Sequence, residues 1–312
     1  MRVPWKVPVM QAPIGPATTP ELVSAVTSTG ALGALAASWT KPGTLRRQLR
    51  AIRAAAGTDY CVNLVLAFDQ RERLEVVLDE GARYVSFSWG IDGELIGRAR
   101  ERGAVVLVQV GDVASALDAA ECGAQILIAQ GVEAGGHVQG RTPLLELVGE
   151  LRRVFELPIV ASGGIGDVAS ARAALEAGAS AVACGTAYLV AHEADVHPTY
   201  LERLLHAAAT DTVLTTLFDV GWPDAPHRVL RNDTYTTWES AGRPTRGTRD
   251  GEGEVVGARN ASPIVRYSDA QPTRSTTGDI DAMALYAGTS VGHVHQRASA
   301  RAITEALALA LT

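Results

Sequence analysis

Eight short apolar runs, spaced through residues 7–189, constrain the fold of this chain more than any other feature. Within each run the apolar residues are continuous rather than alternating with polar ones. Continuous apolarity is typical of strands that are buried on both faces, as in a parallel sheet. The runs occupy residues 7–14, 31–36, 61–66, 84–89, 104–110, 125–130, 158–164 and 181–189.

Helical patterns that end on glycine separate these runs. The first has Thr19 as the expected N-cap and Pro20 at the first helical position. Residues 111–128 and 166–183 resemble each other closely, which indicates a repeated strand–helix unit. Eight such units predict a (β/α)8 TIM barrel of the α/β class. A doubly wound sheet is the alternative, but it would place a phosphate fingerprint after the first strand, where Gly15 stands alone.

The pattern breaks near His206. Residues 201–275 are polar and rich in turn residues, and they predict a smaller inserted α+β segment that caps the active-site end of the barrel. Residues 1–200 and 276–312 would then form the barrel. Weak helical patterns flank the insert at 198–209 and 279–288, and a final helix over 298–311 is expected to return to the barrel wall.

Composition limits the functions that remain. The net charge of −6 argues against a nucleic-acid partner. The three cysteines have neither disulfide nor zinc spacing, so we expect a reducing cytoplasm and no metal. No apolar run approaches the length of about 20 residues that spans a bilayer. The sequence leaves the oligomeric state open, a homo-oligomer included.

Glycine-rich turns follow the seventh and eighth predicted strands. In a barrel the loops at these two positions commonly bind phosphate. Gly163, Gly164 and Gly185 can offer backbone N–H groups, and Thr186 can add a hydroxyl. The helix that begins near Asp167 would favour an anion through its dipole. The alternative is a pair of ordinary turns.

Polar residues at the ends of the other strands indicate what such a phosphate would carry. Asn63, Gln109 and Gln130 can donate and accept hydrogen bonds, which suits the heteroatom edge of a flavin ring. Main chain at residues 12–14 (Ala12, Pro13 and Ile14) would approach the barrel axis. The alternative is that the buried amides satisfy one another.

The stretch "QGVEAGGHVQG", residues 130–140, directly follows the sixth predicted strand. Adjacent glycines pack nothing and cost backbone entropy, so Gly135 and Gly136 suggest a flat ligand against bare backbone. His137 would then lie beside that ligand. Its ordinary pKa near 6.5 would let it act as a base or as a cation near neutrality. The alternative is a tight turn followed by a surface histidine.

Together, "MQAPIG", "TPEL", "NLVL", "QGVEAGGH", "ASGGIGD" and "CGTAYL" resemble the nitronate monooxygenase (2-nitropropane dioxygenase-like) family of FMN-dependent TIM-barrel enzymes. The resemblance covers about residues 7–193 and resumes at 278–288. It implies FMN as cofactor, with His137 as the active-site histidine. It further implies phosphate contacts at Gly163, Gly164, Gly185 and Thr186. Ser162 departs from the family, which commonly has alanine there; its hydroxyl is either an extra phosphate or ribityl contact or no contact. The flavin ring would lie near residues 12–14, Asn63, Gln109, Gln130 and the backbone of Gly135 and Gly136.

The resemblance implies oxidation of alkyl nitronates, or of nitroalkanes, by O2 to a carbonyl compound and nitrite. One departure leaves the substrate open: Gly140 stands three residues after His137, whereas the family commonly has glycine two residues after it. An NAD(P)H-dependent flavin reductase acting on a quinone or an enoyl thioester is the alternative on the same barrel. A non-catalytic protein that binds a phosphorylated ligand is a third.

Overall fold

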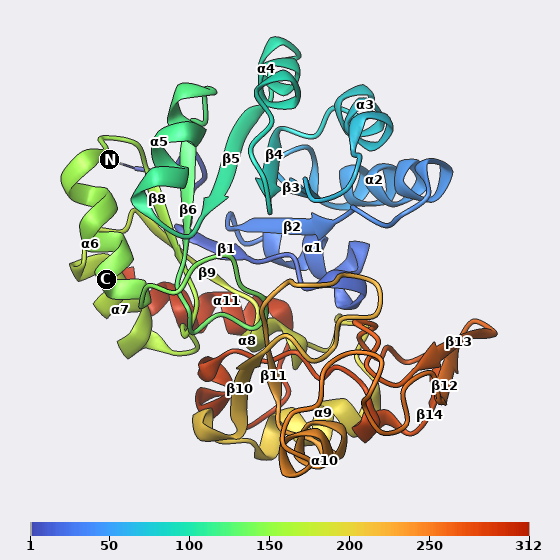
Figure 1. Ribbon diagram of the computed structural model, residues 1–312. Coiled ribbons are helices and arrows are strands. Elements are labelled where there is room, and N and C mark those ends of the chain that lie inside the picture. The colour runs from blue at the N-terminus through green and yellow to red at the C-terminus, as the bar shows by residue number, and fades with distance from the viewer. Residues whose placement is uncertain (1, 312) are drawn as a thin grey trace.

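The computed structural model describes residues 2–311, so the chain ends at 1 and 312, assigned above to the barrel, lie outside the described residues. Eight parallel strands close a barrel in the order β1-β2-β3-β4-β5-β6-β8-β9, which confirms the predicted TIM barrel (Figure 1). These strands are β1 (Val9–Gln11), β2 (Leu32–Ala36), β3 (Cys61–Val65), β4 (Tyr84–Ser88), β5 (Val105–Val110), β6 (Ile126–Gln130), β8 (Ile159–Ser162) and β9 (Ala181–Cys184).

Two apolar layers stabilise the barrel. Side chains such as Met10, Leu107 and Val160 fill its interior, and a larger cluster packs between the strands and the outer helices. Near the chain start, Trp5 packs edge-on against Tyr84 at the amino-terminal ends of the strands, with ring centroids 5.8 Å apart. The opposite end of the barrel, where the carboxyl ends of the strands lie, is left for a site.

The outer helices are α1 (Pro20–Thr27), α2 (Pro42–Ala56), α3 (Arg71–Asp79), α4 (Gly93–Glu101), α5 (Val113–Glu121), α6 (Leu144–Val154), α7 (Val168–Glu176) and α11 (Ala300–Ala308). Thr19 caps α1 as predicted, accepting a hydrogen bond from the Leu22 N–H at 3.0 Å. The returning α11 contacts both α7 and α1, so it completes the outer ring (Figure 1). The sequence patterns did not predict α6.

Residues 201–275, which we call the capping segment, lie below the barrel in Figure 1, coloured yellow to red. Around and within it are α9 (Pro198–His206), β10 (Thr212–Thr215), β11 (His227–Leu230), α10 (Asp233–Ser240), β12 (Val255–Arg259), β13 (Ser262–Val265) and β14 (Thr276–Gly278). Two three-stranded sheets form, β10-β11-β7 and β13-β12-β14, where β7 is Gly136–His137. The division of the chain into barrel and capping segment stays a prediction.

Two local predictions are wrong. The predicted strand over 181–189 ends at Cys184, and a short helix, α8 (Thr186–Leu189), follows it. The helical pattern over 279–288 forms only a 3-10 turn at Ile280–Ala282 and then runs extended. It stays extended because its backbone pairs elsewhere: the Leu230 N–H donates to the Leu285 carbonyl at 2.8 Å.

Four further 3-10 turns occupy Gly15–Ala17, Ala209–Asp211, Thr289–His293 and Leu309–Leu311. Within residues 2–311, no helix is both long enough and apolar enough to cross a bilayer. The same residues contain no group of three or more His, Cys, Asp or Glu side chains placed to hold a metal ion.

Candidate functional site

A cavity of about 550 Å³ opens at the carboxyl ends of the barrel strands. Its walls bring together every residue that the sequence nominated for the site. From β1 to β9 these are Ala12, Pro13, Ile14, Asn63, Gln109, Gln130, Gly135, Gly136, His137, Ser162, Gly163, Gly164, Gly185 and Thr186. The roles assigned to them stay predictions, but their surroundings are now defined.

The turn after β8 presents unused backbone donors to this cavity. Within the part of the chain that the structure describes, the N–H groups of Gly163 and Gly164 make no hydrogen bond. Both residues have positive φ, +124° and +67°, which side chains rarely adopt. A Cβ at Gly163 would lie 3.1 Å from the Ala134 nitrogen. The turn therefore requires glycine and leaves adjacent N–H groups free for an anion.

The start of α7 is less available than the sequence suggested. The Asp167 carboxylate accepts a hydrogen bond from the Ser170 N–H at 2.8 Å. The Ser170 hydroxyl in turn accepts from the N–H groups of Gly166 and Asp167. Because these donors are used and Asp167 brings a negative charge, an anion would be held by the glycines before the helix and not by the helix end itself.

On the next turn, Thr186 already has one partner. Its hydroxyl accepts a hydrogen bond from the Gly288 N–H at 2.9 Å, so it retains only its own hydrogen to donate to a ligand. The backbone N–H of Gly185 and the hydroxyl of Ser162 have no hydrogen-bond partner among the described residues. Ser290, which the sequence did not nominate, also lines the cavity here.

The three amide side chains are largely engaged by the protein. Asn63 donates to the Ser86 hydroxyl at 3.1 Å, and Gln109 donates to the Gln139 side chain at 2.6 Å. Gln130 donates to the His137 carbonyl at 3.0 Å and accepts from the Gln139 N–H at 2.9 Å. Gln130 therefore fixes the backbone at His137 and at Gln139, a positioning role that the sequence did not predict.

Two neighbours of His137 have structural roles of their own. A Cβ at Gly135 would lie 2.6 Å from the Ala287 carbonyl carbon, so this glycine lets the loop pack against the returning chain. Gly136 instead has open space around it and φ +74°, which fits the predicted bare backbone beside a ligand. The Glu133 carboxylate accepts from the Leu144 N–H at 3.0 Å, so it caps α6 and does not orient His137.

His137 lies in an aromatic enclosure. Its ring stacks on Trp222 of the capping segment, with centroids 4.3 Å apart and planes at 25°. Trp89 meets it edge-on at 5.9 Å, and Tyr286 lies at 5.6 Å. The backbone of β7 pairs with β11, in the register His137 opposite His227. This is not the surface histidine of the simpler interpretation.

The enclosure changes the chemistry expected of His137. Burial, assisted by the nearby His227, lowers the pKa of His137 to about 3. The imidazole is therefore neutral at neutral pH, and the expectation of a pKa near 6.5 is wrong for this structure. Its Nε2 atom is buried and has no hydrogen-bond partner among the described residues. A buried polar atom without a partner is rare in proteins, so the ring is a candidate to contact a ligand.

The sequence missed the residues that the capping segment contributes to the cavity. These are Trp222, Arg259, Asp269, Ala270 and Gln271, and Tyr286 follows from the returning chain. They join Trp39 and Trp89 from the barrel loops. No local pattern identifies them, although a tryptophan in an otherwise polar, turn-rich stretch was a usable signal for Trp222.

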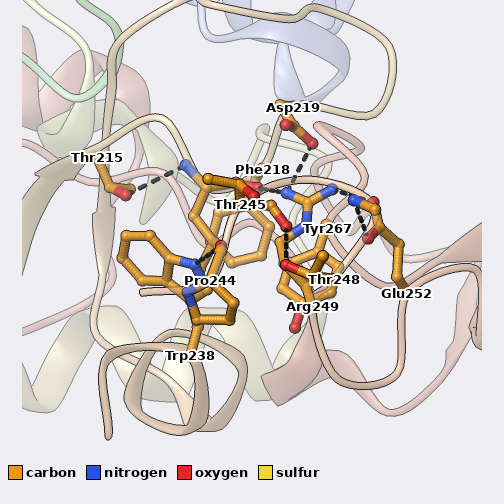
Figure 2. Close-up of polar contacts among 12 residues, drawn as sticks. Thr215, Phe218, Asp219, Trp238, Pro244, Thr245, Thr248, Arg249, Glu252 and Tyr267 are labelled. Carbon is orange, nitrogen blue, oxygen red and sulfur yellow. Dashed lines mark hydrogen bonds and ion pairs between the residues drawn. The ribbon is translucent and has the colours of Figure 1, made fainter. Parts of the chain in front are cut away.

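A buried arginine holds the part of the capping segment that carries Trp222. Arg249 is 7% exposed, and it donates to the Leu217 carbonyl at 3.1 Å and to Asp219 at 2.9 Å. Figure 2 shows its guanidinium between Asp219 and Glu252, with Tyr267 beneath it. These contacts fix residues 217–219, three to five positions before Trp222.

Comparison with known proteins identifies the family. The sequence model of the nitronate monooxygenase family matches residues 3–72 and 56–309. The chain belongs to the nitronate monooxygenase family. Its relatives include enzymes of several names, and membership makes this chain a flavin-dependent oxidoreductase.

Three relatives of this nitronate monooxygenase family member illustrate the range of named activities. A Mycobacterium tuberculosis protein named (3aS,4S,5R,7aS)-5-hydroxy-7a-methyl-1-oxo-octahydro-1H-indene-4-carboxyl-CoA dehydrogenase is 34% identical over 264 residues, 84% of this chain and 71% of the relative. The structure of FabK from Thermotoga maritima is 26% identical with a TM-score of 0.82, covering 97% of this chain and 92% of that one. Nitroalkane oxidase from Streptomyces ansochromogenes is 28% identical with a TM-score of 0.79, covering 98% and 96%.

Proposed function

We propose that the cavity binds FMN and that the enzyme oxidises alkyl nitronates with O2 to a carbonyl compound and nitrite. The observation that carries this proposal is the pairing, in one cavity, of free N–H groups at Gly163 and Gly164 with an unpartnered buried nitrogen on His137. The first suits a phosphate and the second suits the polar group of a substrate. Family membership supports the flavin.

The residues present fit FMN. The phosphate would bind Gly163, Gly164 and Gly185, with hydroxyl donors from Ser162 and Thr186. The ring would lie near residues 12–14 and the open backbone of Gly136, within reach of Asn63 and Gln109. Bound FMN would accept two electrons from the substrate and pass them to O2. Among the described residues, the free glycine N–H groups suit one phosphate at the ends of β8 and β9, so we propose FMN and not FAD.

Neutral His137 would donate or accept a hydrogen bond at Nε2 and so orient the substrate nitro group. It does not serve as a positive clamp, because burial keeps its pKa far below neutrality. Trp222 and Trp89 exclude water from this position, which strengthens any such hydrogen bond. The free thiols of Cys61, Cys122 and Cys184 fit the reducing cytoplasm that we propose as its location.

A second candidate is an NAD(P)H-dependent reductase or dehydrogenase acting on a thioester. Arg259 lines the cavity from the capping segment and supplies a positive charge that a phosphorylated carrier would use. The 34% identity to a protein named as a CoA-thioester dehydrogenase, and the similarity to FabK, support this alternative.

Rapid mixing under anaerobic conditions separates the two candidates. The flavin-loaded protein is mixed with propyl-2-nitronate and, separately, with NADH and NADPH, and flavin absorbance is followed. Fast bleaching by the nitronate supports the proposal. Fast bleaching by a nicotinamide, with none by the nitronate, would reject it in favour of the reductase.

A further inference from the structure

A second titratable side chain faces the cavity from the capping segment. Asp269 lines the cavity together with Ala270 and Gln271. Its carboxylate lies directly against the backbone of Gly221: a Cβ added at Gly221 would be 2.8 Å from Oδ2. Gly221 has φ +117°, so both its conformation and this contact require glycine. The residue after Gly221 is Trp222, the one stacked on His137.

Asp269 and His137 therefore both line this cavity, and each contacts one residue of the Gly221–Trp222 pair. Two hydrogen bonds to the backbone of Asp269 fix this residue in place. Its N–H donates to the Val220 carbonyl at 3.1 Å, and its carbonyl accepts from the Tyr286 hydroxyl at 2.9 Å. Tyr286 itself lies beside the His137 ring.

The carboxylate has no compensating side-chain partner. Within residues 2–311, no side chain donates a hydrogen bond to it, although Arg259 and Tyr286 line the same cavity. Arg259 donates to the Gln271 carbonyl at 3.1 Å instead. Burial raises the pKa of Asp269 to about 6, and the charge of Arg259 opposes that rise. Asp269 thus presents to the cavity a carboxylate without a side-chain partner, with a pKa closer to neutrality than that of an ordinary aspartate.

We propose that Asp269 is the base that removes the α-proton of a neutral nitroalkane in this cavity, so that the enzyme forms its own nitronate before oxidising it. This inference rests on the proposed function and names the group that would let the enzyme use neutral nitroalkanes as well as nitronates. His137 keeps its role as the neutral group that orients the nitro substituent.

The proton-transfer step balances without an oxidant. The Asp269 carboxylate takes the hydrogen from the carbon that carries the nitro group, and a carboxylic acid results. The electron pair of the broken C–H bond becomes the C=N bond of the nitronate, and one N=O π pair moves onto oxygen as its negative charge. Arg259, on the same segment, would offset that new anionic charge.

The test compares Asp269→Asn with wild type on two forms of one substrate, 2-nitropropane and propyl-2-nitronate. Asparagine matches the carboxylate in shape, so the contact with Gly221 is kept. Asp250→Asn is the matched control, since Asp250 is an exposed aspartate on the same segment and outside the cavity. Flavin content is measured for all three proteins.

We expect Asp269→Asn to lose 10²–10⁴-fold in kcat/KM on neutral 2-nitropropane, as for loss of one acid–base group, and to stay within about threefold of wild type on the nitronate. In wild type, the nitroalkane rate should rise with pH through about 6. Infrared difference titration should show a protonated carboxyl band that disappears over the same range in wild type and is missing from Asp269→Asn.

The two substrates, 2-nitropropane and propyl-2-nitronate, test the role of Asp269 separately from the proposed function. Wild type that oxidises the nitronate but not 2-nitropropane would overturn the role of Asp269 and leave the proposed function intact. An Asp269→Asn variant with the wild-type ratio of the two activities would do the same. Wild type that oxidises neither form would overturn the proposed function, and the role of Asp269 with it.

Discussion

Trp222 stacks on His137 at a centroid distance of 4.3 Å, although 85 residues separate them in the chain. This contact removes the imidazole from water and is a principal reason that it stays neutral. It also makes the capping segment part of the histidine's environment and not merely a cover over it.

Replacing Trp222 with alanine should therefore raise the pKa of His137 from about 3 toward its ordinary value of 6.5. NMR titration of the imidazole measures this directly. Trp39→Ala is the control, because Trp39 lines the same cavity and contacts Trp222 but not His137. If both variants leave the titration of His137 unchanged, its burial does not depend on Trp222.

Gly163→Leu should yield protein with little bound flavin. The side chain would be forced into a positive-φ position and against the Ala134 backbone, where the free N–H groups face the cavity. Gly43→Leu is the matched control, since Gly43 has no atom near its Cβ position. Flavin is released by heat and identified by mass. Full flavin occupancy in Gly163→Leu would show that the phosphate binds elsewhere. Recovery of FAD alone from wild type would reject FMN.

His137→Ala should lower activity on the nitronate and on the neutral nitroalkane by similar factors, about 10- to 100-fold. A hydrogen bond to the charged nitronate, or to the nitro group as it gains negative charge during deprotonation, is worth about 1.5–3 kcal/mol, and both reactions would lose it. Flavin content should not change. A much larger loss on the nitroalkane alone would instead assign the proton transfer to His137.

Asp269→Asn should make the folded protein more stable at pH 7.5. Burial raises the Asp269 pKa from 3.8 to about 6, so wild type loses stability as pH rises through this range. Asparagine carries no charge and escapes that loss, which corresponds to about 1–3 kcal/mol above pH 7. Thermal unfolding at pH 4 and pH 7.5 measures it. We expect the two proteins to unfold at similar temperatures at pH 4 and the variant to unfold later at pH 7.5; a variant that is less stable at both would contradict a costly buried carboxylate.

The barrel could be predicted because the residues that determine each strand and helix lie close together in the sequence. Each strand carries a continuous apolar run, and caps such as Thr19 lie within a few residues of the helices they begin. Residues 279–288 were predicted wrongly because hydrogen bonds to the Leu230 backbone and to the Thr186 hydroxyl hold them extended. These partners lie 55 and 102 residues away in the sequence from the residues they bond. Those partners cannot be recognised from spacing.

The candidate site also contains residues that the sequence could predict and residues that it could not. Residues at strand ends, such as Gly163 and Gln130, were nominated because a barrel gathers all its strand ends in one place. Trp222 and Asp269 reach the cavity through a segment with no repeating pattern. The pKa of His137 was mispredicted for the same reason, because the rings that bury it include Trp222.

The pairing of β7 with β11 has a consequence for how this enzyme can be re-engineered. Because His137 and the capping segment share one sheet, neither can be transplanted alone into a relative without breaking hydrogen bonds of the other. A chimera that exchanges residues 135–139 together with 212–230 keeps the sheet whole. New substrate preferences are therefore most readily acquired by replacing these two stretches as one cassette.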